Sequence, residues 1–263
     1  MATTTVSAIL RSNQAYYAQL SDTTSLQFGI AYTCPRYPSL EFANQFREVL
    51  IEQSGDVETA FAEAEAYFAG AGVKCHAWAL AADQPIEPVA TFLSSKGYRR
   101  RDLSAMVVRE WVELPAPQDV RVLPARAMPK ALHAIHAEEF RMSDSVKQEM
   151  LMAAATERFN EPQIDAFLAL VDGAPAGHCT LFQVGDIGRI VDLFVVESFR
   201  RRGVATALIG HLLRMARRLT MRLTCAEIPS DSVAALTLCE RCGLVGDGTT
   251  TELVEGSKLK VEG

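Results

Sequence analysis

The segment Val195-Val-Glu-Ser-Phe-Arg-Arg-Arg-Gly-Val-Ala-Thr-Ala-Leu208 connects the most apolar run of the chain to its clearest helical pattern. The run from Gly188 to Val196 is nearly continuous and apolar, which is typical of a strand buried on both faces. From Gly203 to Leu219, apolar residues recur at helical spacing. A strand followed by a short turn and a helix places unpaired backbone N–H groups at the helix N-terminus, where they attract phosphate.

The turn itself, Arg200-Arg-Arg-Gly-Val-Ala205, has the residue types that an anion site needs. Gly203 lets a ligand approach the backbone closely, Ala205 adds almost no bulk, and three arginines attract a multiply charged anion. The sequence lacks both the Gly-Lys-Ser/Thr of a P-loop and the three glycines of a dinucleotide-binding fingerprint. A solvated, arginine-rich helix face is the alternative interpretation.

Composition excludes several classes of protein. A formal charge of -6 argues against a general nucleic-acid binder, and 49% hydrophobic with 22% charged residues argues against disorder. The N-terminus lacks the pattern of a signal peptide, and no window is apolar enough for a membrane span, so we expect a cytoplasmic protein without a membrane partner. The six cysteines are scattered as buried reduced thiols would be, and the lone Cys239-Glu-Arg-Cys242 does not predict a metal site.

A domain boundary is predicted near Val112-Glu-Leu-Pro-Ala-Pro-Gln-Asp119, where two prolines separate two strand-like runs. It divides the chain into domains 1–115 and 119–263. The first domain is predicted as a smaller α/β unit, with helices at Pro38–Glu52, Asp56–Phe68 and Ile86–Ser95 and strands at Cys75–Leu80 and Ser104–Val108.

The second domain is predicted as an α/β (α+β) fold with a mixed central sheet flanked by helices. Asp172-Gly173 suits the tight turn of a β-hairpin between the flanking strands Asp165–Val171 and Gly177–Phe182. The other expected elements are helices at 129–139, 145–155, 203–219 and 231–241, and strands at 120–123, 188–196, 222–228 and 249–254.

The segment Val195–Leu208 resembles the acetyl-CoA motif of the GNAT (N-acetyltransferase) superfamily, in which Arg or Gln precedes x-x-Gly-x-Gly/Ala. Residues 119–254 also follow the order of elements in that family. The resemblance implies acetyl-CoA as co-substrate and no metal. By resemblance, the backbone of a splayed strand pairs with the pantetheine arm at Leu193, Phe194 and Val195. The implied pyrophosphate site consists of Arg200, Arg201, Arg202, Gly203, Val204, Ala205 and Thr206.

The resemblance implies catalytic residues as well. Glu227 matches the glutamate that acts as general base in GNAT proteins similar to the ribosomal-protein alanine acetyltransferases; a solvent-exposed strand residue is the alternative. Cys239 replaces the tyrosine that usually protonates coenzyme A, so it is either a substitute acid or a small apolar helix residue. Ser232 occupies the family's asparagine position beside the cofactor.

Other polar residues carry weaker signals. His178 and His211 have no partner identifiable in sequence and are interpreted as structural. By resemblance, Glu138, Glu139 and Arg141 lie where the family places its substrate-facing helices, but ordinary helix-surface charge is the favoured interpretation. The segment Pro88–Tyr98 resembles the end of a GNAT fold without its phosphate loop, which suggests a degenerate GNAT-like first domain in a tandem arrangement.

These observations predict an N-acetyltransferase that transfers acetyl directly from acetyl-CoA to a small-molecule or peptide amine. A non-catalytic acyl-CoA sensor or scaffold is the alternative, motivated by Cys239 and the degenerate first half. A nucleotide-binding regulator using the arginines is disfavoured by the acidic balance of the chain. The sequence does not identify the acceptor, and an exposed edge strand would permit a homodimer.

Overall fold

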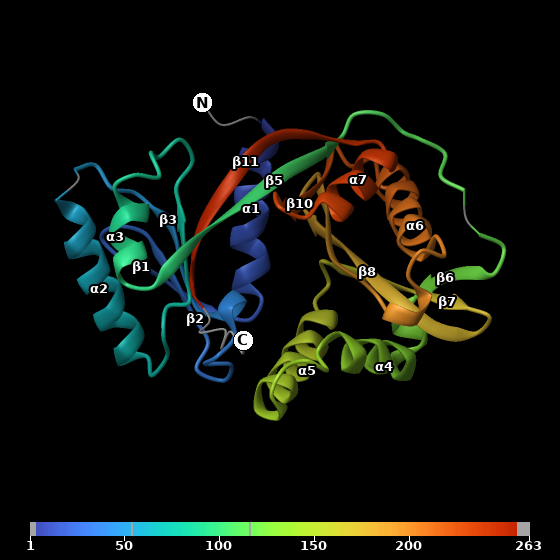
Figure 1. The fold of residues 1–263 in the computed structure, drawn as a ribbon, viewed down its shortest axis with the longest axis horizontal. Helices are drawn as coiled ribbons and strands as arrows, with labels where there is room; N and C mark the ends of the chain where they lie inside the picture. Colours follow the sequence, from blue (N-terminus) through green and yellow to red (C-terminus); the bar gives the residue numbers. More distant parts are fainter. Residues whose placement is uncertain (1–3, 54, 116, 257–263) are drawn as a thin grey trace, which may run out of the picture. The chain divides into compact units, whose positions relative to one another are not determined.

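The computed structural model describes residues 4–53, 55–115 and 117–256 (Figure 1). These residues form two compact units. The N-terminal unit comprises Leu20–Leu103 and the chain from Thr249 onward, and the C-terminal unit comprises the first helix and Ser104–Gly248. The units therefore differ from the sequence-based domains 1–115 and 119–263, because residues 4–19 pack with the C-terminal unit and residues 249–256 with the N-terminal one.

The N-terminal unit is a mixed sheet with two helices. Its strands follow the order β1-β2-β3-β4-β11-β5, in which β3 and β4 are parallel and β4 and β11 antiparallel. The edge-to-face pair of Phe46 and Trp78, with ring centroids 4.8 Å apart, lies at its buried centre. The elements are β1 (Asp22–Ser25), β2 (Ile30–Thr33), η1 (Glu41–Ala43), β3 (Gln45–Val49), α2 (Asp56–Gly70), β4 (Ala77–Leu80), α3 (Val89–Ser95) and the first part of β5 (Tyr98–Val108).

The predicted helix at Pro38–Glu52 is wrong, because this segment forms the short helix η1 and then strand β3. Four of its buried apolar residues, Leu40, Ala43, Phe46 and Val49, recur at every third position. That spacing imitates a helix face, but it arises from a 3-10 turn leading into a strand that lies between β2 and β4. A strand with neighbours on both sides buries nearly every residue, so the alternation that identifies strands is missing.

The C-terminal unit is a sheet covered by helices on both faces. Its strand order is β11-β5-β10-β9-β8-β7-β6. Strands β10 and β9 are parallel, and the pairs β9–β8, β8–β7 and β7–β6 are antiparallel. Asp172 and Gly173, both at positive φ, form the predicted hairpin turn, which is confirmed. The elements are α1 (Thr4–Ala18), β6 (Val120–Pro124), η2 (Ala125–Ala127), α4 (Pro129–Glu139), α5 (Ser145–Phe159), β7 (Ile164–Val171), β8 (Ala174–Val184), β9 (Ile187–Val195), η3 (Glu197–Phe199), α6 (Val204–Arg218), β10 (Leu223–Pro229), α7 (Val233–Arg241) and β11 (Leu244–Glu255).

Alternate residues of β7 face two separate cores. Phe167, Ala169 and Val171 pack in the core that contains the buried face of α6, whereas Leu168 and Leu170 pack with residues of α1 and α4. Figure 1 shows α6 and α7 on one side of these strands and α4 and α5 on the other. Helix α6 packs against β9, and helix α1 packs against both β9 and β10. The candidate site lies where those two strands separate. None of the helices in the described residues is both long and apolar enough to span a bilayer.

A buried charged cluster in the N-terminal unit leads to a stability prediction. The Glu252 carboxylate, 3% exposed, binds Arg47 at 2.8 Å and Arg101 at 2.6 Å. Burial alone would raise the pKa of Glu252, but the two guanidinium groups outweigh it and hold the pKa below its ordinary value. Glu252→Gln removes a buried carboxylate that balances the buried Arg47 charge, so we expect the free energy of unfolding to fall by about 3–5 kcal/mol at pH 7.

This loss should depend on pH. Because the pKa of Glu252 is lowered in the folded protein, its contribution is present above the unfolded pKa of about 4.3 and disappears as the pH falls below it. The difference between wild type and Glu252→Gln should therefore shrink in acid. Urea unfolding measures this difference in the free energy of unfolding, with Trp78 fluorescence as the signal in a Trp111→Phe background. Glu58→Gln, at an exposed position of α2, is the control. A difference that stays constant from pH 7 to pH 3 contradicts the prediction.

Candidate functional site

Strands β9 and β10 separate beyond a short parallel ladder. They pair from Leu223 with Ile187 to Ala226 with Ile190. On its other side β9 continues to pair with β8 as far as Val195, after a bulge where Asp192 adopts a φ of 53°. The backbone edge of Leu193, Phe194 and Val195 that faces β10 thus lies outside the ladder. These are the residues predicted to pair with an extended ligand, and Leu193 is 37% exposed.

The arginine-glycine turn follows β9 directly. Gly203 has a φ of 77° and precedes the first residue of α6, Val204, so the first backbone N–H groups of this helix have no intrahelical acceptor. A Cβ atom at Gly203 would lie 2.7 Å from Cγ of Pro117, and a positive φ is strained in a residue with a side chain. The turn therefore requires glycine for its own conformation, independently of any ligand. Ala205 and Thr206 follow in the first helical turn, each half-buried.

The three arginines of the turn have different surroundings. Arg202 binds Asp119 at 2.7 Å and Asp172 at 3.4 Å, and Arg200 donates to the backbone oxygen of Val195 at 3.3 Å. Within the described part of the chain, Arg201 makes neither a hydrogen bond nor an ion pair, and it is exposed at a φ of 63°. Arg202 thus links the turn to the β7–β8 hairpin and to the start of β6, whereas the guanidinium of Arg201 is exposed to solvent.

The residues predicted on α7 differ in exposure. Ser232 is half-buried at the N-cap, where its side chain makes no capping hydrogen bond. Cys239 is 4% exposed among the apolar residues that also contact α6, and burial raises the pKa of its thiol to about 11. A thiol with so high a pKa is a poor proton donor to a departing thiolate, whose ordinary pKa is about 8.5. The role of Cys239 as acid stays a prediction, and its packing favours the apolar interpretation.

Glu227 follows the last paired residue of β10. Its carboxylate binds Nη2 of Arg189 at 2.9 Å, and both side chains are less than 10% exposed. Nδ2 of Asn13 donates to the same Glu227 oxygen at 3.4 Å. Arg189 also donates to Asn13 and to the hydroxyl of Ser12. The predicted base is therefore a buried member of an ion pair beside the strand gap, and its catalytic role stays a prediction.

Helix α1 brings further polar groups to the same face of the sheet. The hydroxyl of Tyr16 lies 2.8 and 2.9 Å from the two carboxylate oxygens of Asp192, and Arg158 donates to that hydroxyl at 2.9 Å. Burial is the main cause of the raised pKa of Tyr16, which keeps the phenol protonated. These residues were not predicted from the sequence. Val6, Ile9, Asn13 and Tyr16 recur at helical spacing, but the polar residues among them weaken the apolar pattern that identifies a helix.

Two histidines and a glutamate meet between α4 and β8. Nε2 of His178 lies 2.9 Å from Oε2 of Glu139, and the His136 and His178 rings are edge to face, 4.8 Å apart. Burial, and secondarily His178, lower the pKa of His136 to about 4, so this imidazole is neutral at pH 7. From the sequence, His178 is interpreted as a structural residue without an identifiable partner. In the structure its partner is Glu139, 39 positions earlier in the chain.

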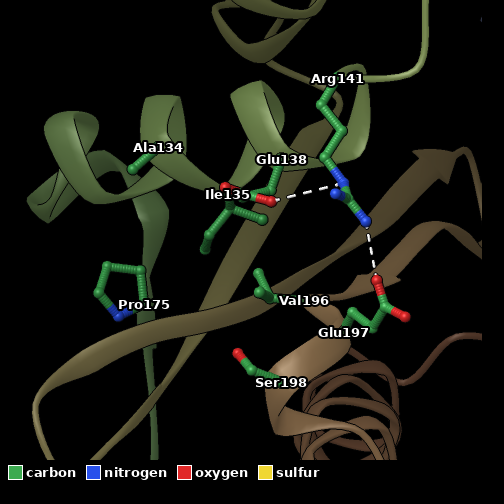
Figure 2. Close-up of a pocket in the computed structure, with 8 residues that line it drawn as sticks. All are labelled: Ala134, Ile135, Glu138, Arg141, Pro175, Val196, Glu197 and Ser198. Carbon is green, nitrogen blue, oxygen red and sulfur yellow. Dashed lines mark hydrogen bonds and ion pairs between the residues drawn. The ribbon is translucent and has the colours of Figure 1, made fainter.

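A surface groove of about 570 Å³ lies beside this cluster and is drawn in Figure 2. Arg141 lies between two carboxylates, 2.7 Å from Glu197 and 3.7 Å from Glu138. All three side chains are more than half exposed, so these ion pairs contribute little to stability. The groove is lined by Ala134, Ile135, Glu138, Arg141, Pro175, Val196, Glu197 and Ser198.

Residues 130–244 match the family described as acetyltransferase (GNAT) family. The C-terminal unit contains a GNAT domain. The matched residues include β9, the arginine-glycine turn, α6, β10 and α7, which together form the candidate site. A search of curated protein sequences finds no significant match to this chain.

Solved structures share the fold well beyond the GNAT domain. A GCN5-related N-acetyltransferase from Kribbella flavida matches with a TM-score of 0.69 at 16% identity, covering 98% of each chain. A functionally unknown conserved protein from Staphylococcus epidermidis matches with a TM-score of 0.73 at 15% identity, over 90% of this chain and 95% of that one. A tandem GNAT protein from the clavulanic acid biosynthesis pathway matches with a TM-score of 0.58 at 14% identity, over 94% and 89%. At such identities the likeness concerns the fold, and it includes the residues before the GNAT domain.

Gly177 should be essential to the geometry of the GNAT site. A Cβ atom there would lie 2.5 Å from the backbone oxygen of Phe194, on the strand predicted to hold the cofactor. We expect Gly177→Ala to displace β9 and to lower the free energy of unfolding by about 1–3 kcal/mol. The control is Gly246→Ala in β11, where the nearest atom lies 4.0 Å away and alanine should be neutral or stabilising. Equal urea midpoints for the two variants would contradict this prediction.

Proposed function

We propose that this chain is an acetyl-CoA-dependent N-acetyltransferase that transfers acetyl directly to an amine acceptor. The observation that carries the proposal is the unpaired edge of β9 leading into a glycine turn and the N-terminus of α6, all within the segment that matches the GNAT family. An extended amide-containing arm fits an unpaired strand edge, and a pyrophosphate fits helix N–H groups beside the unengaged Arg201. Acetyl-CoA has both parts and supplies an activated thioester.

The residues on the α1 face of the gap suit the acceptor side of this reaction. The acceptor nitrogen must lose a proton as it attacks the thioester, and Glu227 lies where β9 and β10 part. Because Arg189 and Asn13 already donate to this carboxylate, we propose that it takes the proton through a bridging water. Arg189 then serves to orient Glu227. The acceptor is proposed only as a class, a small-molecule or peptide amine.

The cofactor site should be tested by Ala205→Glu rather than by a change at Gly203, which is needed for the conformation of the turn. A carboxylate in the first turn of α6 would repel the pyrophosphate and occupy its space. We expect the Kd for acetyl-CoA, measured by isothermal titration calorimetry, to rise at least about tenfold, equivalent to about 1.4 kcal/mol. Ala66→Glu, at an exposed position of α2, is the matched control and should bind as wild type does. Equal affinity of the two variants would refute the proposed cofactor site.

The main alternative is an acyl-CoA sensor without turnover, and the buried position of Cys239 favours it because no tyrosine occupies that place. Coenzyme A release across a panel of amines separates the two functions. An enzyme should turn over at least one amine, and Glu227→Gln should lower kcat by about 10²–10⁴ while leaving the Kd for acetyl-CoA near wild type. Glu240→Gln, at an exposed position of α7, is the control. Binding without turnover supports the sensor, and turnover unaffected by Glu227→Gln removes Glu227 from the mechanism.

A further inference from the structure

A cluster of two imidazoles and one carboxylate lies at the contact between α4 and β8. His136 and Glu139 are three positions apart on α4 and therefore share a face, which packs against His178 of β8. One side-chain nitrogen or oxygen from each residue lies within 4.8 Å of the others. His136 is 8% and His178 3% exposed, whereas the Glu139 side chain is 24% exposed, so the cluster has two buried imidazoles and a carboxylate that reaches the surface.

The His136 ring lacks a polar partner. Among the described residues it stacks on Phe140 and meets the edge of His178, but its ring nitrogens make no hydrogen bond. The ring nitrogens of His136 are therefore available as ligand atoms, and one of them lies within 4.8 Å of the corresponding atoms of Glu139 and His178. The second carboxylate of this region, Asp192, is close enough to act electrostatically on His136. Two imidazoles beside a carboxylate suit a divalent cation.

We propose that His136, Glu139 and His178 bind a zinc ion. Two imidazoles and one carboxylate form a common protein ligand set for zinc, with a fourth position for water. Bonds of about 2.1 Å place the ligand atoms of a tetrahedral site about 3.4 Å apart, so side-chain rotations must close the observed separations of up to 4.8 Å. The hydrogen bond between His178 and Glu139 gives way to bonds from both residues to the ion.

Zinc at this position would link helix α4 to the central sheet. The link joins residues 136 and 178, and Ile135 and Glu138 of the same helix line the groove of Figure 2. The ion would thereby fix one wall of that groove. This site is independent of the proposed acetyl transfer, since it uses neither the turn at Gly203 nor Glu227.

Helix α4 contains its own matched controls. His133 lies one helical turn before His136, and Glu138 lies one residue before Glu139. Both control residues are exposed. The protein is stripped with chelator, dialysed and titrated with zinc chloride by calorimetry, and bound zinc is counted by mass spectrometry. We expect one zinc per chain and a rise in Tm on binding. His136→Ala, His178→Ala and Glu139→Gln should each weaken binding at least about tenfold, whereas His133→Ala and Glu138→Gln should bind as wild type does.

Cobalt substitution tests the geometry separately. Co²⁺ in a site with two imidazoles and a carboxylate should give the visible absorption of tetrahedral cobalt, which is absent in Glu139→Gln. Because Glu139 is partly exposed and glutamine is isosteric, this variant should fold even if the alanine variants do not. The proposal is overturned if the protein does not bind stoichiometric zinc. It is also overturned if wild type and Glu139→Gln bind zinc equally, which is the result expected if Cys239 and Cys242 held the ion.

Discussion

Parallel pairing between β9 and β10 ends at Ile190 and Ala226, and β9 bulges two residues later at Asp192. Backbone N–H and C=O groups are obligatory hydrogen-bonding groups, so a strand edge that stops pairing near the middle of a sheet must find other partners. The antiparallel ladder with β8 keeps β9 extended on its other side. The gap is therefore held open by the sheet itself, and a ligand with peptide-like groups fits it. The glycine turn at the end of β9 depends on the same geometry, because it brings the start of α6 to the strand end.

The charged residues beside the gap depend on helix α1. Arg189 projects from β9 toward the layer of α1, where Ser12 and Asn13 accept its hydrogen bonds and Glu227 balances its charge. Without α1, a buried guanidinium and a buried carboxylate would lose part of the hydrogen bonding that makes their burial tolerable. Residues 4–19 therefore belong physically to the C-terminal unit, although residues 20–103 of the N-terminal unit separate them from the rest of it in the sequence.

The elements that could be predicted from the sequence are those whose signal is local. The amphipathic pattern of α6 and the Asp172-Gly173 turn are decided by residues near one another in the chain, and both are confirmed. The strand β3 was predicted as a helix because its neighbours β2 and β4 bury it, and they are recruited from other parts of the sequence. Helix α1 had no prediction because its buried face includes Ser12, Asn13 and Tyr16, polar residues that are acceptable only next to Arg189 and Asp192.

Contacts between elements distant in the sequence also decide the chemistry of the candidate site. Resemblance to a family assigns a residue to a position, but its chemistry depends on what surrounds that position. Cys239 occupies the place of a tyrosine and packs against α6, where burial raises the pKa of its thiol. Glu227 occupies the place of a base and is held by an arginine from the adjacent strand. In both cases the decisive neighbour comes from another element, which the sequence pattern around the residue does not reveal. The arginine-glycine turn is one continuous segment, so its local structure can be predicted from the sequence alone.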